Sequence, residues 1–204
     1  MRFTAEELAR LGVWDEEDSD QIRHTTLGEN PLWDAAFVVG ISGVVRSKSN
    51  YRRGGRRRSR QRWSQVSEFE ERTRRAFEKA RPGSWPDPDP ALPVNRRPQV
   101  VSVCYARAIL DTSNLTKSIL DAAEGILYAN DSVVRGEYSQ VERGGKNQLL
   151  VCGFAAYTPR PGGDGRAFQI AAELWPHVQA MFSGWEADAE SPEGDCGGGV
   201  RGGQ

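Results

Sequence analysis

The segment between residues 99 and 134 constrains the fold of this chain more than any other. QVVSVCYARAI (99–109) alternates apolar and polar residues, as a half-buried strand does. A helix of about residues 113–124 follows, with a buried stripe formed by Leu115, Ile119, Ala122 and Ile126. SVVRGEYSQVE (132–142) has the composition of a second strand. This order of elements predicts a helix packed on a β-sheet.

Further strands and a helix flank this segment. AAFVVGISGVV (35–45) is apolar and β-rich, which is typical of a buried strand, and SEFEERTRRAFEKA (67–80) has a capping box followed by helical spacing. NQLLVCGFAAY (147–157) predicts a strand that pairs with residues 132–142 through a turn at Gly144-Gly145. The order of these elements predicts an α+β fold, a small mixed β-sheet packed with helices.

Charge divides the 204 residues into three parts. Residues 1–34 hold three basic and nine acidic residues, and residues 35–157 hold 21 basic and 12 acidic residues. Residues 158–204 are acidic again, with three basic and seven acidic residues. We therefore predict a domain at 35–157, an acidic N-terminal extension at 1–34, and a C-terminal helix with a disordered acidic, glycine-rich tail at 158–204. A basic centre between acidic ends indicates a polyanionic partner.

Composition also excludes several classes of protein. The three cysteines are widely spaced and form neither a zinc pattern nor a disulfide framework. The two histidines disfavour histidine-centred metal sites and Ser-His-Asp triads. No apolar run approaches the length of a membrane span, and no signal peptide is visible. We expect a reduced, cytoplasmic protein without a membrane partner.

A strongly basic stretch, RSKSNYRRGGRRRSRQRW (46–63), contains nine Lys and Arg residues and no acid. One interpretation is a solvated loop or a localisation-like basic run. The other is a loop, turning at Gly54-Gly55, that contacts DNA phosphates while Tyr51 and Trp63 stack on exposed bases. The predicted DNA-contacting residues are Lys48, Asn50, Arg52, Arg53, Arg56, Arg57, Arg58 and Arg60.

Two aspartates bracket the central helix. Asp111 ends one strand and Asp131 opens the next, so both can converge at one edge of the sheet, beside the polar face of Asn114, Lys117 and Asp121. Carboxylates gathered in this way suit Mg²⁺, which activates water and stabilises charge on a phosphate. Alternatively, Asp111 caps the helix, Asp121 pairs with Lys117, and Asp131 begins a turn. Spacing alone favours this second interpretation, because short carboxylate patterns are common.

A longer pattern points to a family. LDTSNLTKSILDAAEGILYANDSVV resembles the signature of RusA-type Holliday-junction resolvases, an Asp-x-Asp-Asn-x-x-Lys run with a further helical Asp and an acidic pair before a strand. Asp111, Asn114, Lys117 and Asp121 match in register, and Asn130-Asp131 keeps the second member of the acidic pair. SKSNYRR (47–53) is similar to the family's basic loop. The resemblance covers roughly residues 35–157.

The resemblance implies a homodimeric endodeoxyribonuclease that depends on Mg²⁺ or Mn²⁺ and cuts four-way DNA junctions by paired nicks in recombination and repair. Such a dimer presents two equal sites to two strands. Asp111 and Asp131 would be catalytic metal ligands, with Asp121 as a further ligand. Lys117 would be the catalytic cation, and Asn114 would support the site.

Ser113 departs from the family pattern, because the family has a second metal-binding aspartate at this position. Three interpretations stay open. Asp121 or Glu137 supplies the missing oxygen, or two aspartates suffice with water and DNA phosphate. In the third, the protein binds junction DNA but cuts it weakly or not at all. We favour retained cleavage, because Asp111, Lys117 and Asp131 all persist.

Overall fold

The computed structural model describes residues 22–46, 56–93, 96–109, 111–144, 148–160 and 165–190, with the backbone alone for residues 56–63, 186 and 188–190. The expected disordered tail after residue 190 lies outside these ranges. The elements are β1 (Ile22–Leu27), β2 (Ala35–Ser42), α2 (Arg56–Ala80), β3 (Gln99–Arg107), α3 (Thr112–Ala123), the 3₁₀ turn η4 (Asp131–Val133), β4 (Val134–Glu142), β5 (Leu149–Tyr157) and α4 (Arg166–Glu190).

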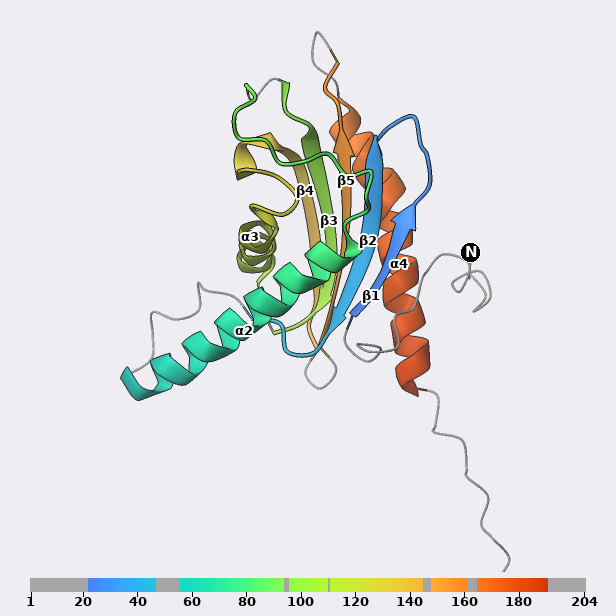
Figure 1. The fold of residues 1–204 in the computed structure, drawn as a ribbon. Coiled ribbons are helices and arrows are strands. Elements are labelled where there is room, and N and C mark those ends of the chain that lie inside the picture. The colour runs from blue at the N-terminus through green and yellow to red at the C-terminus, as the bar shows by residue number, and fades with distance from the viewer. Residues whose placement is uncertain are drawn as a thin grey trace, which may run out of the picture.

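The described strands form one five-stranded mixed sheet with the order β1-β2-β5-β3-β4. Helices α2 and α3 cover one face of the sheet and α4 covers the other (Figure 1). The α+β expectation, a mixed sheet packed with helices, is therefore confirmed. With helices on both faces, β3 is buried along most of its length rather than on one side only.

Strand β4 pairs with β3 and not with β5. Val100 of β3 lies beside Val134 of β4 in a parallel register, while β5 pairs with the other side of β3 in an antiparallel register. The predicted β4–β5 hairpin through Gly144-Gly145 was wrong. Parallel strands need a crossover connection, and α3 provides it, so β4 is carried to the far side of β3 and becomes an edge strand.

Helix α2 begins at Arg56, eleven residues before the start predicted from the capping box at residue 67. The second half of the predicted basic loop is therefore helical. No glycine or proline lies between residues 56 and 80, and arginine is a good helix former. In Figure 1 the N-terminal end of α2 reaches beyond the edge of the sheet.

The folded unit extends past the predicted limits of 35–157. Every residue of β1 pairs with β2, so the sheet begins at residue 22, within the segment predicted as an extension. The predicted C-terminal helix is α4, which packs on the second face through Ile170, Leu174 and Val178. Within the described ranges, no helix combines the length and apolar character needed to cross a membrane.

An aromatic cluster joins α2 to the middle of the sheet. Phe37 of β2 stacks on Phe154 of β5 at 5.6 Å between ring centroids. Phe77 of α2 meets Phe154 edge-on at 5.0 Å, and Trp85 meets Phe37 at 5.3 Å. Because these rings are almost fully buried, the cluster fixes α2 and the connector after it against the sheet.

On the opposite face, α4 packs closely against glycines of the sheet. A Cβ atom added at Gly40 would lie 2.6 Å from the Trp185 ring and 3.2 Å from the Met181 sulfur. We expect Gly40→Ala to lower the free energy of unfolding by about 1–3 kcal/mol, through overpacking. Gly28→Ala is the control, because no atom lies within 4 Å of its added Cβ. Urea unfolding measures both variants, and an equal loss in the two would contradict the expectation.

Candidate functional site

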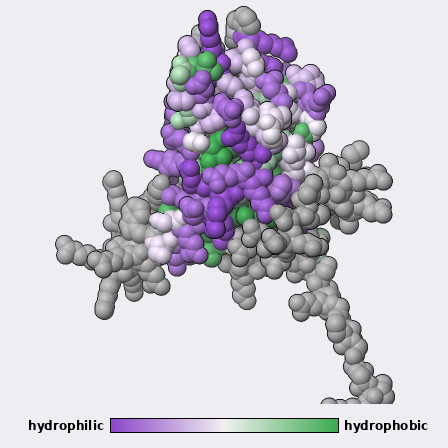
Figure 2. All heavy atoms as spheres, in the orientation of Figure 1, coloured by the Kyte–Doolittle hydropathy of each residue, from purple (hydrophilic) through white to green (hydrophobic). Residues whose placement is uncertain are grey.

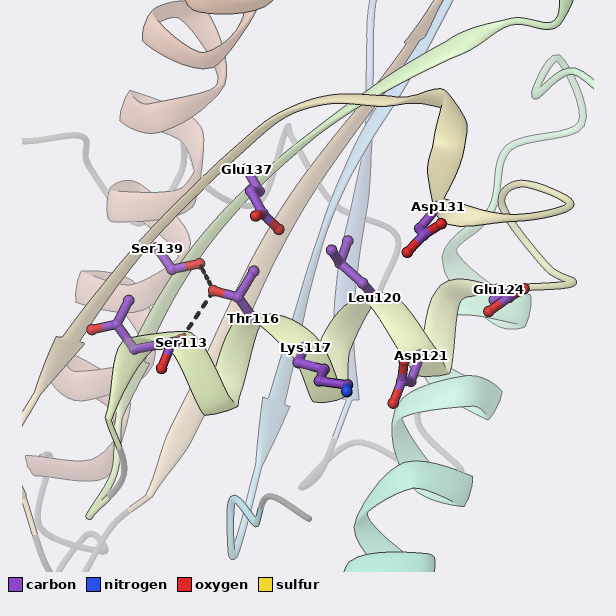
Figure 3. A pocket seen from close by; sticks show the side chains of 10 residues that line it. Ser113, Thr116, Lys117, Leu120, Asp121, Glu124, Asp131, Glu137 and Ser139 are labelled. Carbon is purple, nitrogen blue, oxygen red and sulfur yellow. Dashed lines mark hydrogen bonds between the residues drawn. The ribbon is translucent and has the colours of Figure 1, made fainter. Parts of the chain in front are cut away.

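A hollow of about 490 Å³ lies between α3 on one side and η4 and β4 on the other. Figure 3 shows it from close by, with side chains of α3 opposite Asp131 and Glu137. We call it the α3–β4 hollow. It is lined by Thr112, Ser113, Thr116, Lys117, Leu120, Asp121, Glu124, Asp131, Glu137 and Ser139.

The amphipathic pattern of α3 supplies one wall of the hollow. Leu115, Ile119 and Ala122 are buried toward the sheet, as their spacing predicted. Lys117 and Asp121 lie on another side of the helix and line the hollow. The helix therefore anchors itself by its apolar stripe and presents polar groups at the edge of the sheet.

Asp111 is the N-cap of α3, as the second interpretation of the sequence expected. Its Oδ1 accepts hydrogen bonds from the Asn114 backbone N–H and from the Ser113 hydroxyl, both at 2.9 Å, and its Oδ2 accepts from the Asn114 side chain. The backbone hydrogen bond from Asn114, followed by that from Ser113, lowers the pKa of the Asp111 carboxyl. Ser113 thus supports the cap.

Asp111 and Asp131 do not converge, contrary to the expectation from the sequence. Because β3 and β4 are parallel, Asp131 enters β4 beside the start of β3, whereas Asp111 follows the end of β3. The paired part of β3, from Val100 to Arg107, spans about 23 Å. The structure instead brings Asp131 to the hollow with Glu137, Asp121 and Lys117, and Asp111 is not among the lining residues.

Three hydroxyl groups of the hollow already donate hydrogen bonds within the protein. The Ser113 hydroxyl donates to Asp111, and the Thr116 hydroxyl donates to the Thr112 carbonyl at 3.0 Å. Thr116 and Ser139 are also hydrogen-bonded, at 2.7 Å, so Ser139 must be the donor because a threonine hydroxyl has one proton. Figure 3 shows this chain from β4 to α3. These oxygens are left to accept hydrogen bonds.

The donor set of the hollow fits a hydrated cation. Four carboxylates and one ammonium group line the hollow, and three hydroxyl oxygens add acceptors. Among the described residues, no three His, Cys, Asp or Glu side chains lie close enough to hold a metal ion directly. Mg²⁺ gives up its waters reluctantly, and six waters occupy about 180 Å³, which the hollow accommodates. Asp131, Glu137, Asp121 and Glu124 would hold such an ion through its waters.

Three of these carboxylates also lie near the buried Tyr128. Burial is the main cause that raises the pKa of Tyr128, and Glu124, Asp131 and Asp121 raise it further. The hydroxyl of Tyr128 donates to the Leu120 carbonyl at 2.8 Å. The negative potential at this end of the hollow would repel a DNA phosphate unless a cation offsets it.

Side chains from α2 and the following connector hold the C-terminal end of α3. Arg74 donates to the carbonyls of Ala122 and Glu124 at 3.5 and 3.2 Å, and the Trp85 indole donates to Leu127 at 3.0 Å. The Ala122 and Glu124 carbonyls, at the end of α3, would otherwise lack these partners. Sequence reasoning missed this role of Arg74, because its partners are backbone groups about fifty positions away.

Only half of the predicted DNA-contacting residues lie within the described ranges. Lys48, Asn50, Arg52 and Arg53 lie outside the described ranges. The backbone of α2 includes the other four, Arg56, Arg57, Arg58 and Arg60. The sequence did not single out Glu124, Thr116 or Ser139 as site residues. The sequence offered only their position as a clue: Thr116 and Glu124 lie near Lys117 along the helix, and Ser139 lies on the strand of Glu137.

Searches against protein-family models and curated proteins give no match to this chain. The resemblance to resolvases therefore rests on the residues of the motif itself.

The cap predicts a pH-dependent stability. The pKa of Asp111 is lower in the folded than in the unfolded chain, so its contribution is present above the unfolded pKa and is lost as the pH falls through the folded pKa. We expect Asp111→Ala to be less stable than the wild type at neutral pH, with the difference shrinking below about pH 4. Asp111→Asn keeps the acceptor oxygen and should lose less stability. Urea unfolding across this range measures the effect, and a difference independent of pH would contradict it.

Proposed function

We propose that this protein is a metal-dependent endodeoxyribonuclease that acts on four-way or other branched DNA. The observation that carries the proposal is the α3–β4 hollow, where Lys117, Asp121 and Asp131 of the resolvase-like motif line one cavity. Its acidic lining suits a divalent cation. The basic stretch upstream supplies the opposite charge that a DNA backbone requires.

The residues of the hollow have separate roles in this proposal. Asp131 and Glu137 would hold a divalent cation through its waters. Lys117 donates to a phosphate oxygen and stabilises the charge that develops during hydrolysis. A bound Mg²⁺ or Mn²⁺ supplies the activation of water and the neutralisation of phosphate charge. Asp111 acts through the cap that orients α3.

A symmetric substrate calls for a symmetric enzyme, and we propose a homodimer. A four-way junction has pairs of equivalent strands, and two copies related by a two-fold axis present one hollow to each of two strands. Paired nicks on opposite strands would follow from this arrangement.

A second candidate is a junction-binding protein with little cleavage. It is favoured by the position of Asp111, which caps α3 and lies apart from Asp131. Ser113 adds to this argument, because a neutral hydroxyl stands where the resembling family has a carboxylate. The two candidates share the DNA partner and differ in the chemistry of the hollow.

A nicking assay separates the two candidates. We expect Asp131→Asn and Lys117→Gln to lower the rate of nicking of a labelled four-way junction in Mg²⁺ or Mn²⁺ by about 100-fold or more. Asp111→Asn should cost less, because asparagine also caps a helix. Glu78→Gln, at an exposed position of α2, is the matched control.

The outcomes of this assay are distinct. Binding without nicks in either metal would support the second candidate. Equal affinity for junction and linear duplex would contradict both. Ser113→Asp is an informative companion, because an added carboxylate at the hollow should raise metal affinity.

The coordination of the cation can be tested without measuring activity. Cobalt(III) hexammine has the size of hydrated Mg²⁺, but its ligands do not exchange. If the hollow holds the ion through its outer shell, we expect calorimetry to show hexammine binding at least as tightly as Mg²⁺. The double variant Asp131→Asn/Glu137→Gln should weaken both. Binding of Mg²⁺ without binding of hexammine would indicate direct carboxylate ligands.

A further inference from the structure

Helix α2 is long and only partly embedded in the fold. Its 25 residues span about 37 Å. The described side chains are buried at intervals from Val66 to Ala80, whereas Ser64 and Gln65 are exposed. In Figure 1 the N-terminal end of α2 stands away from the sheet. Figure 2, in the same orientation, shows hydrophilic side chains along the course of the packed part.

Charge is segregated along this helix. Residues 56–62 contain five arginines and no acid, and residues 63–71 contain no cation and three glutamates. Residues 72–81 are basic again, with four arginines and one lysine against one glutamate. A polyanion that follows α2 is therefore attracted at both ends and repelled between them.

Arg74 connects the second basic region to the α3–β4 hollow. Its guanidinium donates to the carbonyl of Glu124, and Glu124 lines the hollow. The aromatic contact of Phe77 with Phe154 holds the same part of α2 on the sheet. With no glycine or proline between residues 56 and 80, the position of the projecting end follows from that of the anchored end.

We propose that α2 is a ruler, whose basic segment 56–62 holds the backbone of a duplex arm at a set distance from the phosphate at the hollow. Arg58 and Arg56 precede Arg74 by 16 and 18 residues, which corresponds to about 24–27 Å along the helix. At 3.4 Å per base pair, this is about seven to eight base pairs. This proposal rests on the proposed function and adds that the duplex arm of the substrate must reach a minimum length.

Duplex DNA is the partner that fits this geometry. Arginine pairs with phosphate through two parallel hydrogen bonds, and a duplex repeats its phosphates at a regular spacing. A duplex of this length is stiff, because its persistence length is about 150 base pairs. A stiff arm beside a stiff helix gives a threshold in arm length, whereas a flexible single strand gives a gradual dependence.

The first experiment measures how affinity depends on arm length. Four-way junctions are prepared with all four arms capped by hairpins and shortened together stepwise, and binding is measured by fluorescence anisotropy in Ca²⁺, with nicking in Mg²⁺ measured separately. We expect a plateau for arms longer than about eight base pairs and a loss of about tenfold for arms shorter than about seven.

Charge removal identifies the segment that causes the threshold. Arg56→Gln, Arg57→Gln and Arg58→Gln together keep good helix formers. We expect this triple variant to bind long-arm and short-arm junctions equally, with the slope of log affinity against log salt reduced by about 2–3. The control carries the same change at three arginines outside α2, Arg96, Arg143 and Arg160, and should keep the threshold.

An insertion tests the length itself. Seven alanine and glutamine residues after Gln65 extend α2 where its side chains become exposed, and a heptad keeps the helix face within about 20°. This moves the basic segment outward by about 10 Å, so the threshold should rise by about three base pairs. Circular dichroism and urea unfolding establish that both variants are folded.

Each result bears on the proposal. A threshold that stays the same in the triple variant, or after the insertion, overturns the ruler. Junctions that are bound and nicked equally well at every arm length also overturn it, and they leave the proposed nuclease function intact. Failure to bind or nick any junction, with long or short arms, overturns both.

Discussion

The parallel pairing of β3 with β4 is the constraint on which the rest of the structure depends. It requires a crossover, and the crossover is α3. It leaves the other side of β3 to β5, so the two central strands are far apart in the sequence. It also sets α3 beside an edge strand, where the polar side of the helix and the residues of β4 enclose a cavity. The candidate site is a consequence of this one connection.

One wall of the cavity, α3, is held by contacts from outside the cavity. The end of α3 is tied to α2 through Arg74, and the connector after α2 holds the following turn through Trp85. Between the walls, the hydroxyl chain from Ser139 through Thr116 to the Thr112 carbonyl joins β4 to α3. The carboxylates and the hydroxyls that already donate both offer oxygen atoms as acceptors, which suits the waters of a hydrated cation.

Local patterns in the sequence predicted individual elements well. Leu115, Ile119 and Ala122 marked the buried side of α3, because burial imposes a helical period on the residues themselves. Pairing was harder to predict. The turn at Gly144-Gly145 suggested a hairpin, yet nothing local records that β3 lies between β4 and β5.

The same limit explains the errors at the candidate site. The convergence of Asp111 with Asp131 followed from the assumption that the end of one strand and the start of the next meet at one edge of the sheet, and the parallel register separates them. Lys117, Asp121 and Asp131 do meet in one cavity, because helix spacing and the start of β4 are local features. Arg74 acts on backbone carbonyls, which carry no residue-specific signal. The sequence did not predict that α2 begins at Arg56, because its run of arginines is also typical of a solvated loop.

The edge position of β4 has a consequence for the order in which the molecule opens. An edge strand has one hydrogen-bonded neighbour, so β4 exchanges its amide protons through smaller local openings than the central β5, whose nine residues are all buried. Glu137 and Ser139 therefore belong to one of the two edge strands of the sheet, and Thr116 to a helix anchored in the core. Any ligand that bridges the two binds only the closed arrangement, so occupancy slows exchange in β4 more than elsewhere.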